Sequence, residues 1–167
     1  MVNKKKEKNN IENIIYVWGQ LCSLSSIDQE KNNVSLFNMI DQFNLPKVFF
    51  EAQKKQGKNL LFPSPCEIVL CWKRMLDISI SNEEISADSK IKLIDPQGVV
   101  LHEILIPIKF PRGINIFRSR IYMQGMWASV FGRYVYQIEM KSPSMVEFKK
   151  VGDILFEVTE RQLPLKI

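Results

Sequence analysis

The stretch KIKLIDPQGVVLHEILIPI at residues 90–108 decides the fold class of this chain. Two runs of aliphatic and β-branched residues flank DPQG at 95–98, a tetrapeptide in which proline presets the turn and glycine relieves its strain. In the first run, Ile91 and Leu93 alternate with lysines, which is the period-two pattern of a strand with one solvent-exposed face. Because an isolated hairpin is only marginally stable, this one needs partner strands and a second layer over its apolar face.

Runs of the same character fill most of the remaining sequence. In addition to the hairpin, we expect strands over residues 14–28, 34–43, 66–75, 116–124, 133–141 and 151–158. Residues 44–57 fit either an extended segment or one or two helical turns that end at Gly57, and the pattern does not choose between them. The sequence therefore predicts an all-β chain folded as an antiparallel β-sandwich, Ig-like or jelly-roll-like, of about eight strands, with a partly open barrel as the alternative.

Local patterns predict where some aromatic residues lie. Ile68, Leu70 and Trp72 alternate along one strand and are expected on its core side. Trp18 also has apolar neighbours, so we expect it in the core. Tyr134 comes just after a turn glycine, as in a tyrosine corner, where the hydroxyl ties a strand to the loop before it.

Length and charge indicate one folded domain. A chain of 167 residues fits a single domain that buries roughly 70% of the surface exposed by its unfolded form. We expect a disordered basic head at residues 1–10, a single β-sandwich domain at 11–163 and a C-terminal tail at 164–167. The sequence KKKEK in the head supplies +3 of the net charge of +5, so the domain itself is nearly balanced. A solvated terminus is the preferred interpretation of this head, and nucleic-acid binding is not expected.

The apolar runs and the cysteines indicate the compartment. No run reaches the roughly 18 apolar residues that span a bilayer, so we expect no membrane span. Three cysteines, an odd number, fit free thiols in a reducing cytoplasm. Cys66 and Cys71 face opposite sides of one predicted strand, and the single histidine, His102, cannot complete a usual zinc set alone. We therefore expect a cytoplasmic protein with no metal site and no cofactor.

Several parts of the sequence together resemble an uncharacterised family of small prokaryotic single-domain β-sandwich proteins of unknown function. They are CSLSSIDQEKNNVSLFNMIDQF at 22–43, WKR at 72–74, and DPQG at 95–98 with GRYVYQIEM at 132–140. The resemblance covers most of the chain after residue 14. It implies the sandwich fold and brings no catalytic residues with it.

His102 is the candidate for catalysis. The sequence contains no GxSxG elbow, no Walker loop and no CxxC pair. Asp95 lies seven residues earlier across a turn, and beside it His102 could activate a hydroxyl or a cysteine thiol. This pair defines a small hydrolase as an alternative function, although a structural histidine is the preferred interpretation.

Arginines mark a candidate anion site. Arg118 and Arg120 share one face of their predicted strand, and Arg133 joins them if that strand pairs with the next one. Guanidinium groups suit carboxylates and phosphates, so these residues define anionic-ligand or nucleic-acid binding as a further alternative. A solvated face of cross-strand ion pairs is preferred, and its acidic candidates are Glu103, Glu139 and Glu157.

The apolar segment 124–131 marks a candidate contact surface. Met126, Trp127, Val130 and Phe131 give it more apolar surface than a solvent-facing loop normally shows. The segment either covers an open end of the sandwich or contacts a partner, which includes a second copy of this chain. We therefore predict a non-catalytic cytosolic binding or scaffold module that acts through contact with a protein partner of unknown identity.

Overall fold

The computed structural model describes residues 13–28, 30–57, 60–75 and 83–161. The predicted head at 1–10 and tail at 164–167 lie outside the described residues. Within these ranges, no helix is long and apolar enough to cross a membrane. The elements of the described chain, in order, are β1 Ile14–Asp28, β2 Asn33–Met39, β3 Gln42–Leu45, α1 Lys47–Gln56, β4 Leu61–Phe62, β5 Cys66–Arg74, β6 Ile85–Ile94, β7 Val100–Phe110, β8 Ile116–Met123, β9 Met126–Trp127, β10 Gly132–Lys141 and β11 Lys149–Glu160.

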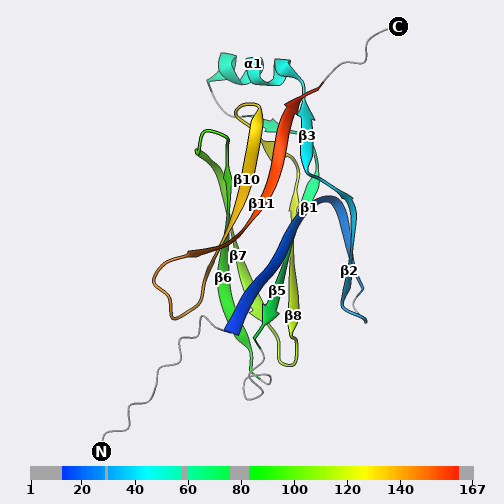
Figure 1. Cartoon of the computed structure of the whole chain (residues 1–167), viewed down its shortest axis with the longest axis vertical. Coiled ribbons are helices and arrows are strands. Elements are labelled where there is room, and N and C mark those ends of the chain that lie inside the picture. Colours follow the sequence, from blue (N-terminus) through cyan, green and yellow to red (C-terminus); the bar gives the residue numbers. More distant parts are fainter. Residues whose placement is uncertain (1–12, 29, 58–59, 76–82, 162–167) are drawn as a thin grey trace, which may run out of the picture.

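The strands form two large sheets that run along the length of the molecule (Figure 1). Sheet A has the order β2-β1-β5-β8, sheet B has the order β3-β11-β10-β6-β7, and β4 pairs with β9 in a small third sheet. The predicted all-β sandwich is confirmed. Its pairs are antiparallel except for β3 and β11, which run parallel.

The described chain has eleven strands where the sequence predicted about eight. Two of the additional strands, β4 and β9, contain only two residues each. The third arises because the predicted strand 34–43 divides into β2 in sheet A and β3 in sheet B. Asn38 takes a positive φ of 49° near the end of β2, a conformation that asparagine tolerates and that interrupts regular strand geometry.

The core lies between sheets A and B. On β5, Ile68, Leu70 and Trp72 are each 0% exposed, as their alternation predicts. Buried residues from sheet B complete the core, among them Ile91, Leu93, Tyr134, Tyr136, Ile138, Ile154 and Phe156. Removing one large apolar side chain of this kind from water stabilises the fold by roughly 1.5–3 kcal/mol.

The prediction that Trp18 belongs to the core is wrong. Trp18 is only partly buried and lies outside the core cluster. The pairing of β1 with β5 shifts register between Tyr16 and Trp18, which sets Trp18 opposite Cys71 rather than on the core side with Trp72. Tyr16 keeps the core side and packs edge-on against Trp72, with ring centroids 5.4 Å apart. One irregular position in the strand therefore reverses the alternation that the sequence suggests.

Residues 44–57, which the sequence left open, contain the helix α1. The helix ends at Gly57, whose positive φ of 64° and N–H bond to the Gln53 carbonyl form a left-handed cap. Lys54 and Lys55 lie in the last turn, where positive charge is favourable to the helix dipole. Figure 1 shows α1 across one end of the sandwich. Phe50 and Gln53 are the buried residues of this helix.

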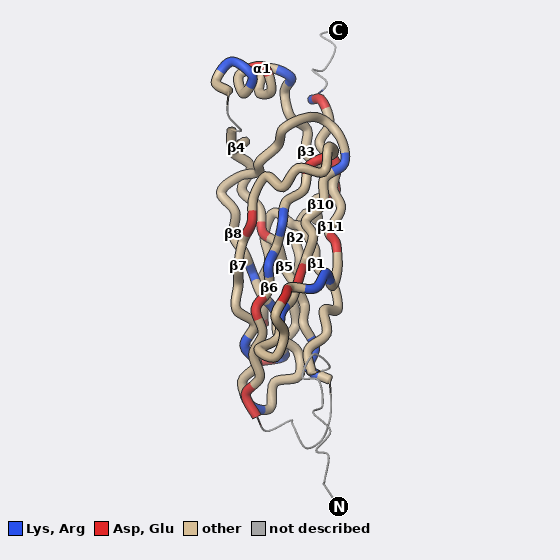
Figure 2. The backbone as a smooth tube through the Cα atoms, turned by 90° about the vertical axis from the view of Figure 1, so that its left-hand side faces the viewer, with Lys and Arg blue, Asp and Glu red and all other residues tan. Residues whose placement is uncertain are grey.

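The DPQG turn joins β6 to β7 as predicted. The Asp95 carboxylate accepts hydrogen bonds from the N–H groups of Gln97 (2.9 Å) and Val99 (2.8 Å), and Gly98 takes a positive φ of 82°. Acidic and basic residues are scattered along the length of the molecule rather than gathered at one point (Figure 2).

Candidate functional site

A pocket of about 220 Å³ opens between β7 and β8. These are edge strands of sheets B and A, so the pocket lies in the seam between the two layers. His102 and Ile104 from β7, Tyr122 and Met123 from β8, and Trp127 from β9 contribute to its lining. The pocket therefore brings together His102, the candidate for catalysis in the sequence, and Trp127, one of the candidates for partner contact.

Trp127 reaches the pocket because it is part of a short strand, not of the loop that we expected. In the pairing of β4 with β9, Phe62 lies opposite Met126 and Leu61 lies opposite Trp127. Successive residues of a strand point to opposite sides, so Met126 enters the core at 1% exposure, whereas Trp127 is only partly buried and lines the pocket. The Trp127 ring stacks on His102, with centroids 6.2 Å apart and an interplanar angle of 30°.

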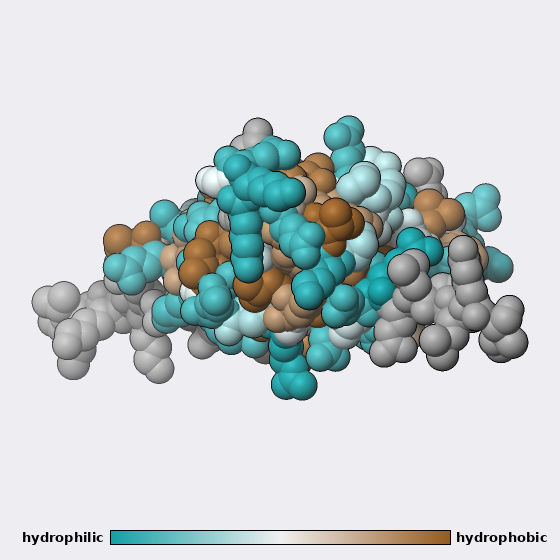
Figure 3. Space-filling model, turned by 90° about the horizontal axis from the view of Figure 1, so that it is seen from above, coloured by the Kyte–Doolittle hydropathy of each residue, from teal (hydrophilic) through white to brown (hydrophobic). Residues whose placement is uncertain are grey.

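The four predicted contact residues thus have different environments. Met126 is inside the core and offers almost no surface, whereas Trp127 lines the pocket. Phe131 is 36% exposed and packs against Phe50 of α1, with ring centroids 4.6 Å apart, and Val130 is half-buried. Hydrophobic patches lie between hydrophilic side chains on the α1 end of the molecule (Figure 3).

The predicted tyrosine corner is confirmed, and it fixes the chain that follows Trp127. The Tyr134 hydroxyl donates to the Val130 carbonyl at 2.6 Å and accepts from the N–H groups of Ser129 (2.9 Å) and Val130 (3.0 Å). Ser129 Oγ in turn donates to Asp95 Oδ2 at 2.6 Å. On the same, C-terminal side of Trp127, Gln53 Nε2 donates to the Ala128 carbonyl at 2.6 Å.

The candidate pair of His102 and Asp95, on which the alternative hydrolase function depends, does not form in this structure. Asp95 is 5% exposed and is engaged by Ser129 and by the turn amides. Within the described ranges, no hydrogen bond joins Asp95 to His102, whose ring lies against Trp127 instead. Sequence proximity across the turn was a poor guide because His102 sits opposite Leu93 on the hairpin, beyond the residues that close the turn.

The cysteines are free and buried, as predicted. They are Cys22, Cys66 and Cys71. Burial raises the pKa of all three thiols, to about 11 at Cys66, so none is a ready thiolate near neutral pH. No group of three or more His, Cys, Asp or Glu residues in the described part of the chain is placed to hold a metal ion.

The predicted arginine face is divided between the two sheets. Arg118 and Arg120 lie on β8 in sheet A, and Arg133 lies on β10 in sheet B. The assumption that consecutive strands pair was wrong here, because β8 pairs with β5 while β10 pairs with β6 and β11. Arg133 lies opposite Glu157 on β11, which is one of the predicted cross-strand partners.

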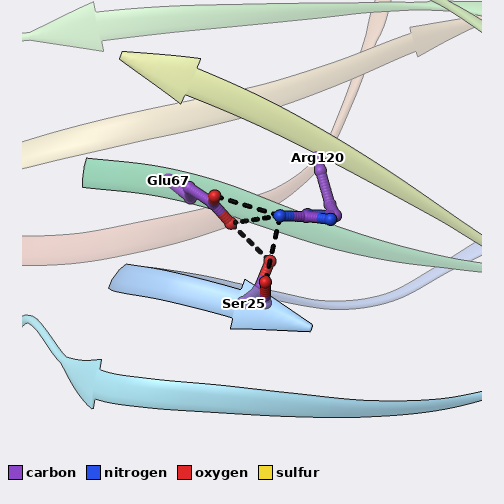
Figure 4. Close-up of polar contacts among 3 residues, drawn as sticks. All are labelled: Ser25, Glu67 and Arg120. Carbon is purple, nitrogen blue, oxygen red and sulfur yellow. Dashed lines mark hydrogen bonds and ion pairs between the residues drawn. The ribbon is translucent and has the colours of Figure 1, made fainter. Parts of the chain in front are cut away.

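Arg120 belongs to a cluster that the sequence did not reveal (Figure 4). Its Nη2 donates to Glu67 Oε1 at 3.1 Å and to the Ser25 carbonyl at 3.0 Å, and the Ser25 hydroxyl donates to Glu67 Oε2. Burial by itself would raise the pKa of Glu67, but the bonds from Ser25 and Arg120 outweigh it and hold that pKa below its ordinary value. Arg120 lies opposite Val69, so Glu67 is its diagonal neighbour on the same face.

Contacts of Asn32 with β8 also hold the hairpin of β1 and β2 in place. Arg118 Nη1 donates to Asn32 Oδ1 at 2.5 Å, and Asn32 Nδ2 donates to the Ile116 carbonyl at 3.3 Å. Because β5 separates β1 from β8 in the sheet, the hairpin must cross β5 to reach these residues. Val69, on the outward face of β5, is accordingly 0% exposed.

No protein-family model matches this chain, and no curated protein matches it. The resemblance to an uncharacterised prokaryotic sandwich family stays a prediction.

Proposed function

We propose that the chain is a non-catalytic protein-binding module whose contact site is the pocket between β7 and β8. The pocket would take an apolar or aromatic side chain from a protein partner. The observation that carries this proposal is the stacking of Trp127 on His102 in the lining of the pocket. Trp and Tyr are enriched at binding hot spots, and Tyr122, which also lines the pocket, is 65% exposed.

The size of the pocket supports a side chain rather than a free small molecule as its occupant. Sites for drug-sized ligands and cofactors usually measure about 300–1,000 Å³. This pocket, at about 220 Å³, is smaller than that range. One inserted side chain, with the rest of the partner resting on Tyr122 and the strand edges, suits a site of this volume.

Rigidity around the pocket supports a binding role as well. The Tyr134 hydroxyl and the Gln53 amide hold the backbone on the C-terminal side of Trp127. A site that is already ordered loses little conformational entropy when a partner binds, which leaves more of the contact energy as affinity.

The two alternative functions have less support. A hydrolase that uses His102 lacks the carboxylate orienter, because Asp95 is engaged by Ser129, and burial disfavours the thiolates. An anion or nucleic-acid site would need arginines that already bond to Glu67 and Asn32. The buried free cysteines support our further proposal that the protein works in the cytoplasm, where thiols stay reduced.

Peptide selection tests this function. Peptides selected from a random phage-displayed library against the full chain would be measured by fluorescence polarisation against the wild type, Trp127→Ala and the control Leu155→Ala. Leu155 is 56% exposed on β11 in sheet B, away from the pocket. We expect Trp127→Ala to weaken binding by about 30-fold or more, as loss of a hot-spot tryptophan does, with no change in Leu155→Ala. Equal affinity of the wild type and Trp127→Ala would contradict the proposal.

A further inference from the structure

The edge strands of the two large sheets differ in how they are protected. Four strands end these sheets: β2 and β8 in sheet A, and β3 and β7 in sheet B. Exposed edges offer unpaired backbone N–H and C=O groups, and proteins protect them with charges, proline or short length. β8 carries Arg118 and Arg120, β7 carries Pro107 and Lys109, and β3 has only four residues. β2 has none of these protections, because its sequence NVSLFNM contains no charge and no proline over seven residues.

β2 also presents apolar side chains to solvent. Phe37 is 49% exposed, Met39 is 67% exposed, and Leu24, directly opposite Phe37 on β1, is 54% exposed. These three residues form one apolar patch at the base of the β1–β2 hairpin. In Figure 1, β2 is the outermost strand on its side of the molecule.

Charges at the two ends of β2 favour pairing of this strand with β2 of a second copy of the chain. Lys31 and Asp41 are both exposed, and each lies five residues from Leu36. A two-fold axis at Leu36 pairs β2 with its copy in antiparallel register, so that the Lys31 end of each strand lies beside the Asp41 end of the other. Glu30 lies one position farther from the strand than Lys31, so Lys31 is the nearer charge. Parallel pairing would instead bring like charges together.

From these observations we infer that two copies of the chain associate through β2, antiparallel about a two-fold axis at Leu36, so that sheet A continues from one copy into the other. Main-chain hydrogen bonds between the two β2 strands supply the affinity, as in other cases of strand addition, and the exposed patch of Leu24, Phe37 and Met39 packs beside them. This inference goes beyond the proposed function, because none of the residues that line the pocket between β7 and β8 belongs to β2.

A lysine placed on the edge tests this interface. Ser35 is exposed near the middle of β2, and Ser26 lies directly opposite it on β1, also exposed. Ser35→Lys puts a charge on the edge, whereas Ser26→Lys adds the same charge one strand away. Light scattering coupled to size-exclusion chromatography would measure mass from about 1 to 100 μM, with circular dichroism to verify folding. We expect twice the chain mass of 19.5 kDa for the wild type and Ser26→Lys, and the single chain mass for Ser35→Lys.

Three outcomes would overturn the inference. They are a wild type that stays monomeric throughout, a Ser35→Lys variant that stays dimeric, and equal disruption by both lysines, which would indicate packing through the apolar face instead of the edge.

A charge exchange tests the antiparallel register. Lys31→Asp alone should weaken the dimer by roughly tenfold, because exposed ion pairs are individually weak and the two-fold axis repeats each pair. Adding Asp41→Lys to that variant should restore wild-type association. No recovery in the double variant would overturn the two-fold arrangement.

Discussion

Two polar clusters of this molecule show how differently a sandwich can use hydrogen bonds. The first cluster joins the loop before β10 to the DPQG turn through Tyr134, Ser129 and Asp95. Tyr134, whose hydroxyl is at its centre, is 0% exposed. Ser25, Glu67 and Arg120 join a hairpin to the outer face of sheet A, and the Arg120 side chain is 40% exposed. The first cluster is enclosed by the core, whereas water competes for the second. The first cluster should therefore control global stability, and the second should control local opening of the hairpin.

Tyr134→Phe should give the largest effect. It keeps the ring in the core but leaves the Val130 carbonyl and the N–H groups of Ser129 and Val130 without their partner. Unsatisfied buried polar groups cost about 1–3 kcal/mol each, and partial relaxation of the loop should leave a loss of about 2–3 kcal/mol in the free energy of unfolding. Urea denaturation measures this loss.

Tyr136→Phe is the matched control for that variant. Tyr136 is 3% exposed, and its hydroxyl donates to the Met123 sulfur at 3.5 Å, which is a weak acceptor. Its loss should stay below about 1 kcal/mol. Equal destabilisation by the two variants would remove the distinction between a tyrosine corner and an ordinary buried tyrosine.

Glu67→Ala should act locally. Without the carboxylate, Ser25 and Arg120 lose the group that joins them, and the β1–β2 hairpin should open more often. Hydrogen–deuterium exchange should then be faster in β2 while the amides of β10 keep their protection. We expect a global cost of only about 1 kcal/mol, since Arg120 is partly solvated.

Glu139→Ala provides the control on the other sheet. Glu139 accepts from Lys92 at 2.7 Å in a similar charged contact, but it has no part in holding the hairpin. If Glu139→Ala accelerated exchange in β2 as much as Glu67→Ala does, the hairpin would not depend on the Ser25–Glu67–Arg120 cluster.

Acid should reveal the smallest effect. The folded pKa of Glu67 is below its ordinary value of 4.5, so its stabilising contribution is complete above that pH and is lost as the pH falls through the folded pKa. The difference in unfolding free energy between the wild type and Glu67→Gln should be constant above about pH 5 and should shrink below it. A difference that stays the same down to about pH 3 would show that the charge of Glu67 contributes nothing.

The features that the sequence predicted are local ones. The DPQG turn, the alternation of Ile68, Leu70 and Trp72, and the bond from Tyr134 to a loop four or five residues earlier depend on neighbours along the chain. The sequence did not decide between a helix and an extended segment for α1, because its ten residues are too few for the periodicity to distinguish the two.

The features that the sequence did not predict depend on distant contacts. Glu67 bonds to residues 42 and 53 positions away, and its strand position looked like ordinary surface until β8 was known to lie beside β5. Trp18 was misplaced because the pairing shifts register between Tyr16 and Trp18, and such a shift leaves no mark in an apolar run. Strand order in a sheet is fixed by packing over the whole core, so no local pattern could assign Arg133 to the other sheet.

The most direct test of the binding pocket is the indole N–H signal of Trp127. In a ¹H–¹⁵N spectrum of the full chain, each tryptophan gives its own indole signal, and Trp18→Phe, Trp72→Phe and Trp127→Phe assign them. Trp72 is the internal reference because its indole N–H is buried and donates to Ser119 Oγ at 3.1 Å. When a selected peptide is added to saturation, the Trp127 signal should move while those of Trp72 and Trp18 stay in place. A bound peptide that leaves the Trp127 signal unmoved would contradict the pocket as the contact site.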